Sequence, residues 1–328
     1  MQAAILGAGV IGRGWAARFL LHGWDVIVYD ADPAAPGRMS QTLDQARLSL
    51  TQLYDAELPS EGQLNYAASV TEAVANADWI QESIPELLSI KRDLYLAIQD
   101  ALPAGTPLAS STSGFKPTDL ASDLSCADQM LVCHPFNPVY LLPVVEVVAG
   151  QRTHQQTVNK AIEILTDIGM KPVTVRREID AHIADRLLEA LWREALWLVA
   201  DDVATTREID EVMRNGFGLR WAQMGLFETY RIAGGDAGMQ HFLAQFGPAL
   251  AWPWSKLTDV PELTAELVDK IAAQSDAQSG HLSIAELERQ RDENLVAIIR
   301  ALKDTNSGAG EHVNAVEAML HNCRADRS

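Results

Sequence analysis

Three glycines near the start constrain the fold of this chain more than any other feature. Gly7, Gly9 and Gly12 form the pattern Gly-x-Gly-x-x-Gly, directly after the apolar run Ala3–Leu6. A helical pattern follows from about residue 12 to residue 21, and the apolar run Val26–Tyr29 comes next. Strand, glycine turn, helix and strand make a βαβ unit of about thirty residues. The sequence therefore predicts an α/β fold that begins with this unit.

In this context the glycine spacing is typical of a turn that binds a dinucleotide. Gly7 permits the tight turn, Gly9 lets the backbone approach a pyrophosphate, and Gly12 lets helix and strand pack closely. Backbone N–H groups at the start of the helix can hold the phosphates. An ordinary glycine turn is the alternative, and the flanking strand and helix argue against it. We therefore expect Gly7, Gly9, Val10, Ile11 and Gly12 to bind the cofactor.

An acidic residue at the end of the second strand indicates which dinucleotide is bound. Asp30 lies 18 residues after Gly12. A carboxylate there accepts hydrogen bonds from the adenine ribose and repels a 2′-phosphate. The alternative is a helix cap, because Asp30 and Asp32 could both serve as N-caps. The glycines upstream favour the ribose role, and NAD is the expected cofactor.

The alternation of short apolar runs and helical patterns continues to about residue 178. Helices are expected over residues 41–53, 90–102 and 158–168, and strands over residues 79–80, 108–109, 130–133, 144–148 and 172–175. Alternating strands and helices imply a mostly parallel, doubly wound sheet that is covered on both faces. Residues 1–178 are therefore expected to form an NAD-binding domain of the Rossmann type.

The pattern changes after residue 178, where helical segments follow one another with almost no strand signal. Residues 181–200 read as one long helix, and this half holds five of the eight tryptophans. We expect residues 179–328 to form an all-helical domain for substrate binding and dimerisation. The polar, glycine-rich stretch 304–310 reads as a flexible connector, and residues 313–320 as a short terminal helix.

Composition excludes several classes of protein. The 328 residues carry a formal net charge of −18, which disfavours binding to nucleic acid. No apolar run is long enough to span a bilayer, and the amino terminus has no signal-peptide pattern. The cysteines Cys126, Cys133 and Cys323 lack metal-ligand spacing. A cytoplasmic protein without a metal or a membrane partner is expected.

A histidine and a glutamate are candidates for acid–base chemistry. His134 closes the apolar run Met130–Cys133 and is followed by Pro-Phe-Asn-Pro, and Glu146 lies inside the run Val144–Val148. A carboxylate among valines is unfavourable unless it is paired. A base and the acid that orients it would suit these positions. Taken singly, each residue is more often structural, as a core histidine or a glutamate on the exposed face of a strand. Periodicity alone therefore leaves both interpretations open.

Three stretches together resemble the 3-hydroxyacyl-CoA dehydrogenase superfamily. They are Ser110–Gly114 (Ser-Ser-Thr-Ser-Gly), His134–Pro138 (His-Pro-Phe-Asn-Pro), and Glu146 at the family spacing. The resemblance runs from the glycine turn into the helical half and covers most of the chain. It implies an oxidoreductase that uses NAD to oxidise the secondary alcohol of a 3-hydroxy acid.

The resemblance also implies roles for individual residues. His134 would be the general base that removes the hydroxyl proton, and Glu146 would hold the imidazole and stabilise its charged form. Ser113 and Asn137 would hydrogen-bond the reacting oxygen and the base.

Other positions follow from the resemblance with less support from the residues alone. Glu86 and Lys91 match positions that contact the nicotinamide-side ribose, and without the resemblance they read as an exposed helix face. Members that act on acyl-CoA have Asn before Arg-Leu in the long helix, whereas this chain has Asp185 before Arg186 and Leu187. This departure puts a thioester substrate in doubt. The family usually pairs through its helical domain, so a homodimer is expected.

The expected substrate is a small 3-hydroxy acid that also carries a cation. Residues 113–119, 134–142 and 218–225 are similar to members that oxidise carnitine, which joins a carboxylate and a quaternary ammonium about a central hydroxyl. Arg220 suits the carboxylate, and aromatic faces suit the ammonium. The candidate aromatic residues are Tyr140, Trp221, Phe227, Tyr230, Trp252 and Trp254, of which most are expected to be core. Gulonate and short 3-hydroxyacyl substrates are alternatives, and a catalytically silent NAD-binding protein is the alternative from another class.

Overall fold

The computed structural model describes residues 1–233, 238–246, 254–256, 262, 264–279 and 281–325. Their contacts divide the chain into two compact units. The first unit comprises Met1–Asp185, Asp292–Arg300 and His312–Ser328, and the second comprises Arg186–Arg291 and Ala301–Glu311. Two segments near the carboxyl terminus therefore belong with the amino-terminal part of the chain.

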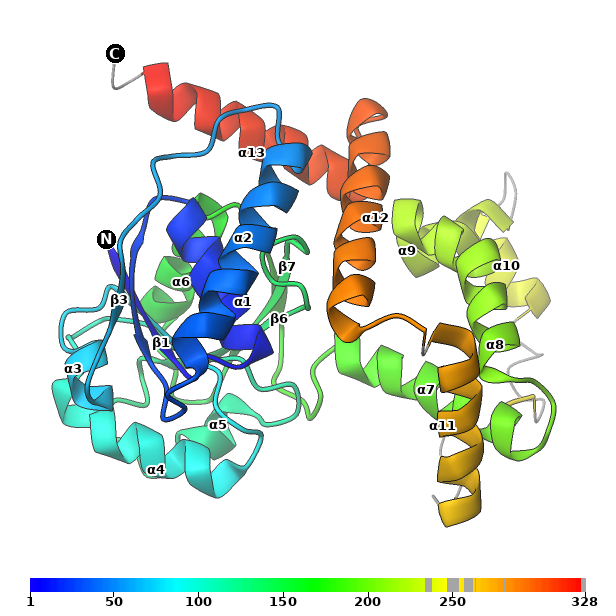
Figure 1. The fold of residues 1–328 in the computed structure, drawn as a ribbon, viewed down its shortest axis with the longest axis horizontal. Helices are drawn as coiled ribbons and strands as arrows, with labels where there is room; N and C mark the ends of the chain where they lie inside the picture. The colour runs from blue at the N-terminus through cyan, green and yellow to red at the C-terminus, as the bar shows by residue number, and fades with distance from the viewer. Residues whose placement is uncertain (234–237, 247–253, 257–261, 263, 280, 326–328) are drawn as a thin grey trace. The chain divides into compact units, whose positions relative to one another are not determined.

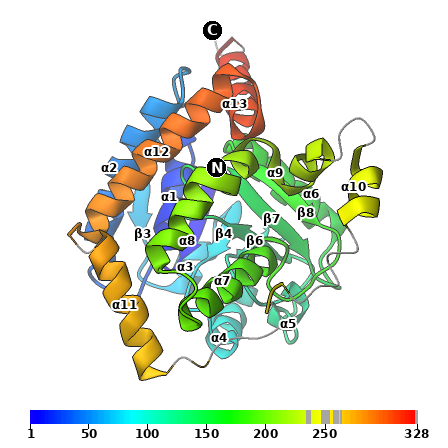
Figure 2. The same cartoon turned by 90° about the vertical axis from the view of Figure 1, so that its right-hand side faces the viewer.

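An eight-stranded sheet forms the centre of the first unit (Figure 1). Its strands are β1 (Gln2–Leu6), β2 (Asp25–Tyr29), β3 (Leu64–Tyr66), β4 (Trp79–Glu82), β5 (Leu108–Ser110), β6 (Met130–Pro135), β7 (Val144–Ala149) and β8 (Lys171–Val175). The order is β3-β2-β1-β4-β5-β6-β7-β8, and only the β6–β7 pair is antiparallel. Figure 2 shows β6, β7 and β8 as neighbours. The predicted α/β fold with a mostly parallel sheet is confirmed.

Helices cover both faces of this sheet. They are α1 (Val10–Leu21), α2 (Ala35–Leu53), α3 (Val70–Val74), α4 (Leu88–Ile98), the 3₁₀ turn η1 (Gln99–Ala101), α5 (Pro117–Leu120) and α6 (Gln155–Asp167). Successive side chains of a strand point to opposite faces. Ala4 and Leu6 pack with Tyr95 and Ile98 of α4 in one core, whereas Ile5 lies against α1. Parallel strands buried on both faces explain the continuous apolar runs in the sequence.

Three short elements of the first unit, β3, α3 and α5, were not predicted from the sequence. Strand β3 has three residues, two of them exposed, so it carries almost no apolar pattern. Helix α3 has five residues, and its N-cap Ser69 accepts a hydrogen bond from the N–H of Glu72. Elements this short fall below the length at which periodicity is visible.

The second unit is helical, as predicted. Its residues belong to α7 (Ala184–Ala200), α8 (Thr206–Val212), the π-helical turn η2 (Met213–Phe217), α9 (Gly218–Ala233), α10 (Gly238–Phe246), α11 (Ala265–Ser279), α12 (Ile284–Asp304) and α13 (Gly308–Ala325), of which α7, α12 and α13 also extend into the first unit. The described residues after 178 include no strand. Within the same described residues, no helix combines the length and the apolar character needed to cross a membrane.

The prediction of a flexible connector over residues 304–310 is wrong. Helix α12 ends at Asp304 and α13 begins at Gly308, so only a short turn separates them. The N–H of Asn306 donates to the carbonyl of Lys303 at 3.0 Å. Asn306 and Gly308 both have positive φ angles, of 49° and 52°. Asn and Gly tolerate this conformation, and here it reverses the chain between two helices rather than loosening it.

Polar contacts bind the carboxyl-terminal segments to the rest of the first unit. Arg300 donates to the carbonyl of Gln52 at 2.9 Å and pairs with Asp55 at 3.0 Å. The N–H of Asp55 donates to Glu317 of α13 at 2.7 Å. The hydroxyl of Tyr140 donates to the buried Asp292. These contacts explain why both segments belong with the first unit.

The buried Arg18 of α1 and the buried His22, which follows α1, lie next to α13. Arg18 donates to the carbonyls of Tyr140 and Gly169, and His312 of α13 approaches the same Gly169 carbonyl at 3.0 Å. Burial, with a smaller contribution from the charge of Arg18, lowers the pKa of His22 to about 3. His22 is therefore neutral in the folded protein at neutral pH.

Candidate active site

The glycine turn between β1 and α1 has the shape that a pyrophosphate requires. Gly7 has a φ of +92°, and a Cβ atom on Gly12 would lie 1.8 Å from the carbonyl oxygen of Gly7. A Cβ on Gly9 would meet open space. Among the described residues no side chain caps α1, and its first turn has no acidic residue. The positive end of the helix and its N–H groups therefore fit an anionic group.

Asp30 lies beside this turn at the end of β2. Its Oδ2 atom accepts a hydrogen bond from the N–H of Ala8 at 2.5 Å, and its Oδ1 atom accepts one from Asp32 at 2.7 Å. Helix α2 has Ala34 at its N-cap, without a side-chain cap. Asp30 therefore braces the glycine turn and does not cap the helix, which was the alternative interpretation.

His134 and Glu146 are directly opposite each other in the antiparallel pair β6–β7. The Nδ1 atom of His134 lies 2.8 Å from Oε2 of Glu146, and both side chains are buried. The other oxygen, Oε1, accepts the N–H groups of Ile183 and Ala184 at 2.9 and 3.1 Å. Burial alone would raise the pKa of Glu146, but the hydrogen bonds from His134 and from these two N–H groups lower it overall. A charged carboxylate therefore fixes a proton on Nδ1 and leaves the lone pair on Nε2.

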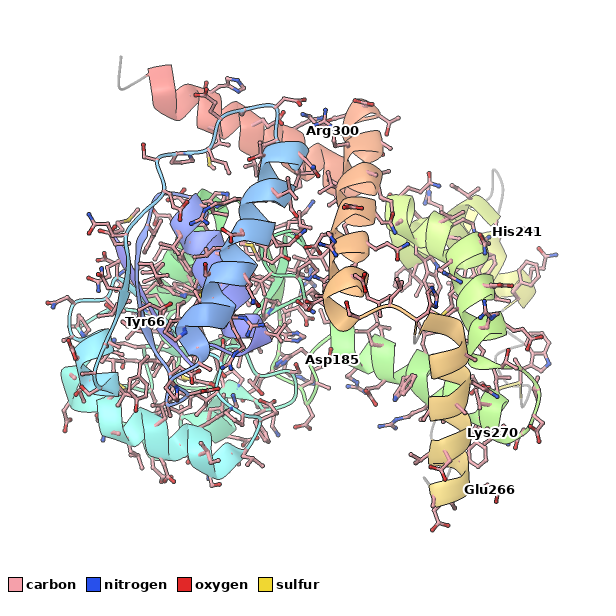
Figure 3. The ribbon with its side chains drawn as sticks, in the orientation of Figure 1. Tyr66, Asp185, His241, Glu266, Lys270 and Arg300 are labelled. Atoms are coloured by element: carbon pink, nitrogen blue, oxygen red, sulfur yellow. The ribbon has the colours of Figure 1, made fainter. Side chains whose placement is uncertain are left out.

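The Nε2 atom of His134 faces two polar side chains. The Oγ atom of Ser113, in the loop after β5, lies 3.1 Å away. The Oδ1 atom of Asp185, at the start of α7, lies 4.0 Å away (Figure 3). Asn137 lies in an exposed position after β6, and among the described residues its side chain has no hydrogen-bond partner. The structure thus brings Ser113, His134, Glu146 and Asp185 together and leaves Asn137 outside this set.

Glu86 and Lys91 have different environments, although both read as exposed helix positions in the sequence. Glu86 is exposed, and its Oε1 atom accepts the hydroxyl of Thr112 and the N–H of Gly114. Burial would raise the pKa of Glu86, but bonds from Thr112 and Gly114 and the charge of Lys91 lower it overall. Lys91 is buried, and its Nζ atom lies 3.3 Å from Glu86.

Sequence reasoning missed Glu82, which is the main partner of Lys91. The Glu82 side chain is 0% exposed and pairs with Lys91 at 2.7 Å. It also accepts hydrogen bonds from Tyr95, Ser110 and the N–H of Ile84. The sequence feature that could have indicated Glu82 is its position two residues after the apolar pair Trp79-Ile80, at the carboxyl end of a strand. The predicted strand ended at Ile80, so Glu82 fell outside it, whereas β4 extends to Glu82.

The proposed substrate residues fall in both units. Tyr140 is buried in the first unit, with its hydroxyl donating to Asp292. Arg220 and Trp221 belong to α9 in the second unit, where Arg220 is exposed and Trp221 packs against Phe217. Of the other candidate aromatic residues, Tyr230 stacks on Phe242, Phe227 and Trp254 are exposed, and Trp252 lies outside the described residues.

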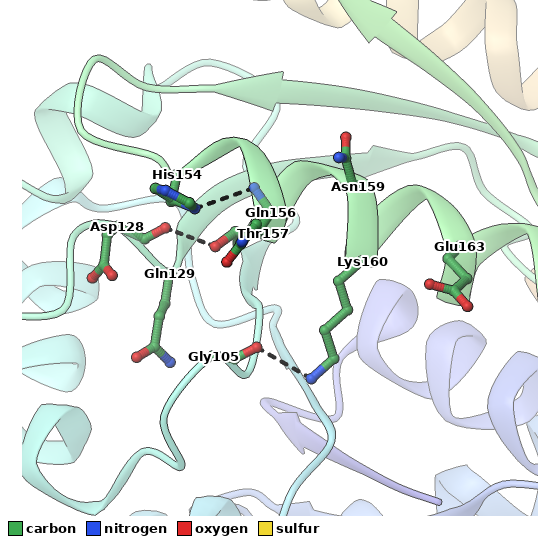
Figure 4. Close-up of a pocket in the computed structure, with 9 residues that line it drawn as sticks. All are labelled: Gly105, Asp128, Gln129, His154, Gln156, Thr157, Asn159, Lys160 and Glu163. Atoms are coloured by element: carbon green, nitrogen blue, oxygen red, sulfur yellow. Dashed lines mark hydrogen bonds between the residues drawn. The ribbon is translucent and has the colours of Figure 1, made fainter.

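A polar cavity of about 450 Å³ lies elsewhere in the first unit (Figure 4). Its lining residues are Gly105, Asp128, Gln129, His154, Gln156, Thr157, Asn159, Lys160 and Glu163. Gly105 precedes β5, and Asp128 and Gln129 precede β6. The cavity is therefore at the amino ends of these strands, away from the carboxyl ends where Ser113 and His134 lie.

Comparisons with known proteins identify the family to which this fold and this site belong. The family model of the 3-hydroxyacyl-CoA dehydrogenase NAD binding domain matches residues 2–179. The model of the C-terminal domain of the same family matches residues 182–274. The chain belongs to the 3-hydroxyacyl-CoA dehydrogenase family.

Two relatives are similar over nearly the whole of this chain. The chain is 60% identical to an L-carnitine dehydrogenase/betainyl-CoA thioesterase of Ruegeria pomeroyi, over 97% of this chain and 65% of that protein. It thus spans less than two thirds of the length of this relative. It is 49% identical to an L-carnitine dehydrogenase of Pseudomonas aeruginosa, over 94% of this chain and 95% of that protein.

A solved structure is also similar over most of the chain. It is the NAD⁺-dependent 5-formyl-3-hydroxy-2-methylpyridine 4-carboxylic acid 5-dehydrogenase, with a TM-score of 0.77 and 30% identity. The likeness covers 92% of this chain and 98% of that one. The first family model matches the part of the chain that contains the sheet, and the second matches a helical part.

Proposed function

We propose that this enzyme uses NAD to oxidise the 3-hydroxyl group of L-carnitine to 3-dehydrocarnitine, with His134 as the general base. The observation that carries the proposal is the Asp185 carboxylate, 4.0 Å from the Nε2 atom of His134. A hydroxyl bound at Nε2 brings the rest of a small substrate close to Asp185. In carnitine the ammonium group is attached to the carbon next to the carbinol carbon, so this carboxylate would meet a cation. The names of the relatives agree with this substrate.

The geometry supports a general-base mechanism. Glu146 holds the Nδ1–H of His134, which directs the Nε2 lone pair at the substrate hydroxyl. Ser113, 3.1 Å from Nε2, is placed to hydrogen-bond the reacting oxygen. The hydroxyl proton moves to Nε2, and Glu146 stabilises the imidazolium that forms. NAD would supply the acceptor for the hydride that leaves the carbinol carbon.

The cofactor would be held mainly by the first unit. The pyrophosphate would lie on the glycine turn, Asp30 would accept hydrogen bonds from the adenine ribose, and Glu86 and Lys91 would be on the nicotinamide side. The turn residues in this assignment are Gly7, Gly9, Val10, Ile11 and Gly12. The lack of a side-chain cap on α1 among the described residues and the open space at Gly9 support it.

The alternative substrates are L-gulonate and short-chain 3-hydroxyacyl groups, with or without CoA. None of these carries a cation, so none would present an opposite charge to Asp185. Arg220 and Trp221, with Tyr140, are our candidates for the carboxylate and the ammonium of the substrate. A guanidinium suits the first group and an aromatic face suits the second.

The test is an NAD-reduction screen over L-carnitine, L-gulonate, 3-hydroxybutyrate and 3-hydroxybutyryl-CoA. We expect the highest kcat/KM with carnitine. His134→Ala should lose about 10²- to 10⁴-fold in kcat, because it removes the base, and should bind NADH normally. The matched control is His154→Ala, at an exposed histidine that caps α6. A wild-type preference for gulonate, or near-normal turnover by His134→Ala, would overturn the proposal.

We also propose that the boundary between cofactor and helical domains falls at residue 178 and that the helical domain pairs in a homodimer. Large apolar side chains lie exposed along one stretch of α7, namely Leu187, Leu188, Leu191 and Trp192. Covering them with a second copy would remove this surface from water. Sedimentation should give a dimer for the wild type and a monomer for Leu188→Glu. A wild-type monomer at micromolar concentration would contradict this.

A further inference from the structure

Two of the four residues before Asp185 adopt an unusual backbone conformation. Ala181 and His182 have φ angles of 61° and 50°. Residues other than glycine seldom adopt positive φ, and they keep it only where surrounding contacts fix the chain. Such contacts are present here, because the N–H groups of Ile183 and Ala184 both donate to Glu146.

The same segment also contacts the serine loop. The N–H of Ala181 donates to the carbonyl of Gly114 at 3.1 Å. The Nε2 atom of His182 lies 3.2 Å from the carbonyl oxygen of Thr112. Ser113 is therefore flanked by two carbonyls that residues 181 and 182 hold. The Thr112 carbonyl belongs to the peptide group that joins Thr112 to Ser113, so fixing it also fixes the start of the serine.

His182 is suited to this contact because it can donate while uncharged. Its side chain is 0% exposed, and a carbonyl can only accept, so Nε2 must carry the proton. Burial lowers the pKa of His182, although the Thr112 carbonyl opposes this, and the ring is neutral at pH 7. His134, Glu146 and Asp185 are the ionisable groups that act on it. The rings of His182 and His134 are 5.5 Å apart, so a neutral ring avoids repulsion when His134 takes up a proton.

We propose that His182 is a positioning residue that holds Ser113 against the Nε2 atom of His134 through the carbonyl of Thr112. This inference rests on the roles proposed above for His134 and Ser113. It predicts that turnover depends on the hydrogen-bond donor of residue 182 and not on the volume of its ring. The other nitrogen, Nδ1, is buried and has no hydrogen-bond partner among the described residues, so Nε2 is the nitrogen that makes the contact.

The kinetic test compares His182→Leu, which has no donor, with His182→Gln, whose amide can donate to Thr112. His182→Leu should lower kcat about 10- to 100-fold, because a small displacement of a reacting group has that effect. Its KM and its affinity for NADH should stay within about twofold of the wild type. His182→Gln should restore most of kcat. Equal losses in both variants, with normal folding by circular dichroism, would overturn the proposal.

A second measurement does not depend on the substrate. The ¹⁵N signal of the His134 Nε2 atom reports its hydrogen bond to Ser113. His182→Leu should move this signal in the same direction as Ser113→Ala, and the double variant should show no further change, because both act on one contact. An unmoved signal in His182→Leu, or additive shifts, would refute the role of His182. Failure of carnitine oxidation with the expected shifts would instead refute only the proposed substrate.

Discussion

Glu146 and Asp185 approach the His134 ring at different nitrogens. Glu146 is buried and accepts three hydrogen bonds, so its charge is fixed and directed at Nδ1. The Asp185 side chain is 29% exposed, and its oxygen is 4.0 Å from Nε2. A partly exposed carboxylate close to Nε2 supports the substrate role proposed above for Asp185.

Asp185→Asn tests this difference directly. We expect KM for carnitine to rise about tenfold, the equivalent of ~1.4 kcal/mol, because the amide removes a charge that attracts the ammonium. KM for 3-hydroxybutyrate should change little. The control is Glu189→Gln, which neutralises an exposed acid of the same helix. Equal increases in KM for the two substrates would leave Asp185 with a structural role.

The sequence predicts some of these residues better than others, for physical reasons. A glutamate in a run of valines needs a partner, and that requirement indicated Glu146. Glu82 gave a weaker signal, because it follows only a short apolar pair and its partners Lys91 and Tyr95 are brought to it by the fold. His182 could not be predicted, because its proposed role depends on a left-handed backbone conformation that no pattern in the sequence indicates.

At the scale of elements, the β1–α1 turn depends on how closely its backbone packs. A Cβ atom on Gly12 would overlap the carbonyl of Gly7, and neither atom belongs to a flexible side chain. Gly12→Ala should therefore separate α1 from β1, weaken NADH binding at least tenfold and lower Tm. NADH fluorescence titration and thermal unfolding would measure both effects.

Gly37 in α2 provides the control, because a Cβ there would meet nothing within 4 Å. Gly37→Ala should stabilise the protein by about 0.5–1 kcal/mol, as alanine does inside helices. If Gly12→Ala behaved like Gly37→Ala, the close approach of helix and strand would have no importance.

Elements with strong periodicity were predicted, and short or context-dependent ones were not. The strands β1, β2, β6 and β7 are continuous apolar runs because helices bury both of their faces. Strand β3 lies at the sheet edge and is largely exposed, so its sequence lacks that run. The polar and glycine residues at 304–310 suggested flexibility. In the structure, Asn306 and Gly308 instead adopt positive φ angles that form a tight turn between two helices.

For the whole molecule, the buried histidines make stability depend on pH. The unfolded chain protonates His22 near pH 6.5, whereas the folded protein does so only near pH 3. Between these values the unfolded state binds more protons, so the free energy of unfolding falls as the pH falls. Burial also lowers the pKa values of His182 and His312, which adds to the same trend.

Urea unfolding between pH 7 and pH 5 measures this dependence. The wild type should lose stability on acidification, by at most ~1.4 kcal/mol per pH unit for each such histidine. His22→Gln should show a shallower loss, and the exposed His281→Gln should match the wild type. Parallel curves for all three proteins would show that His22 does not contribute.

The return of residues 292–300 and 312–328 to the first unit has a consequence for synthesis on the ribosome. Tyr140 emerges 152 residues before its partner Asp292. At roughly 5–20 residues per second, this interval lasts about 8 to 30 s. Until then the surface around Arg18 and Tyr140 stays uncovered, and the nascent sheet presents polar groups and apolar side chains that α12 and α13 later bury. A nascent chain stalled before residue 292 should therefore bind holdase chaperones that release it once α13 has been translated.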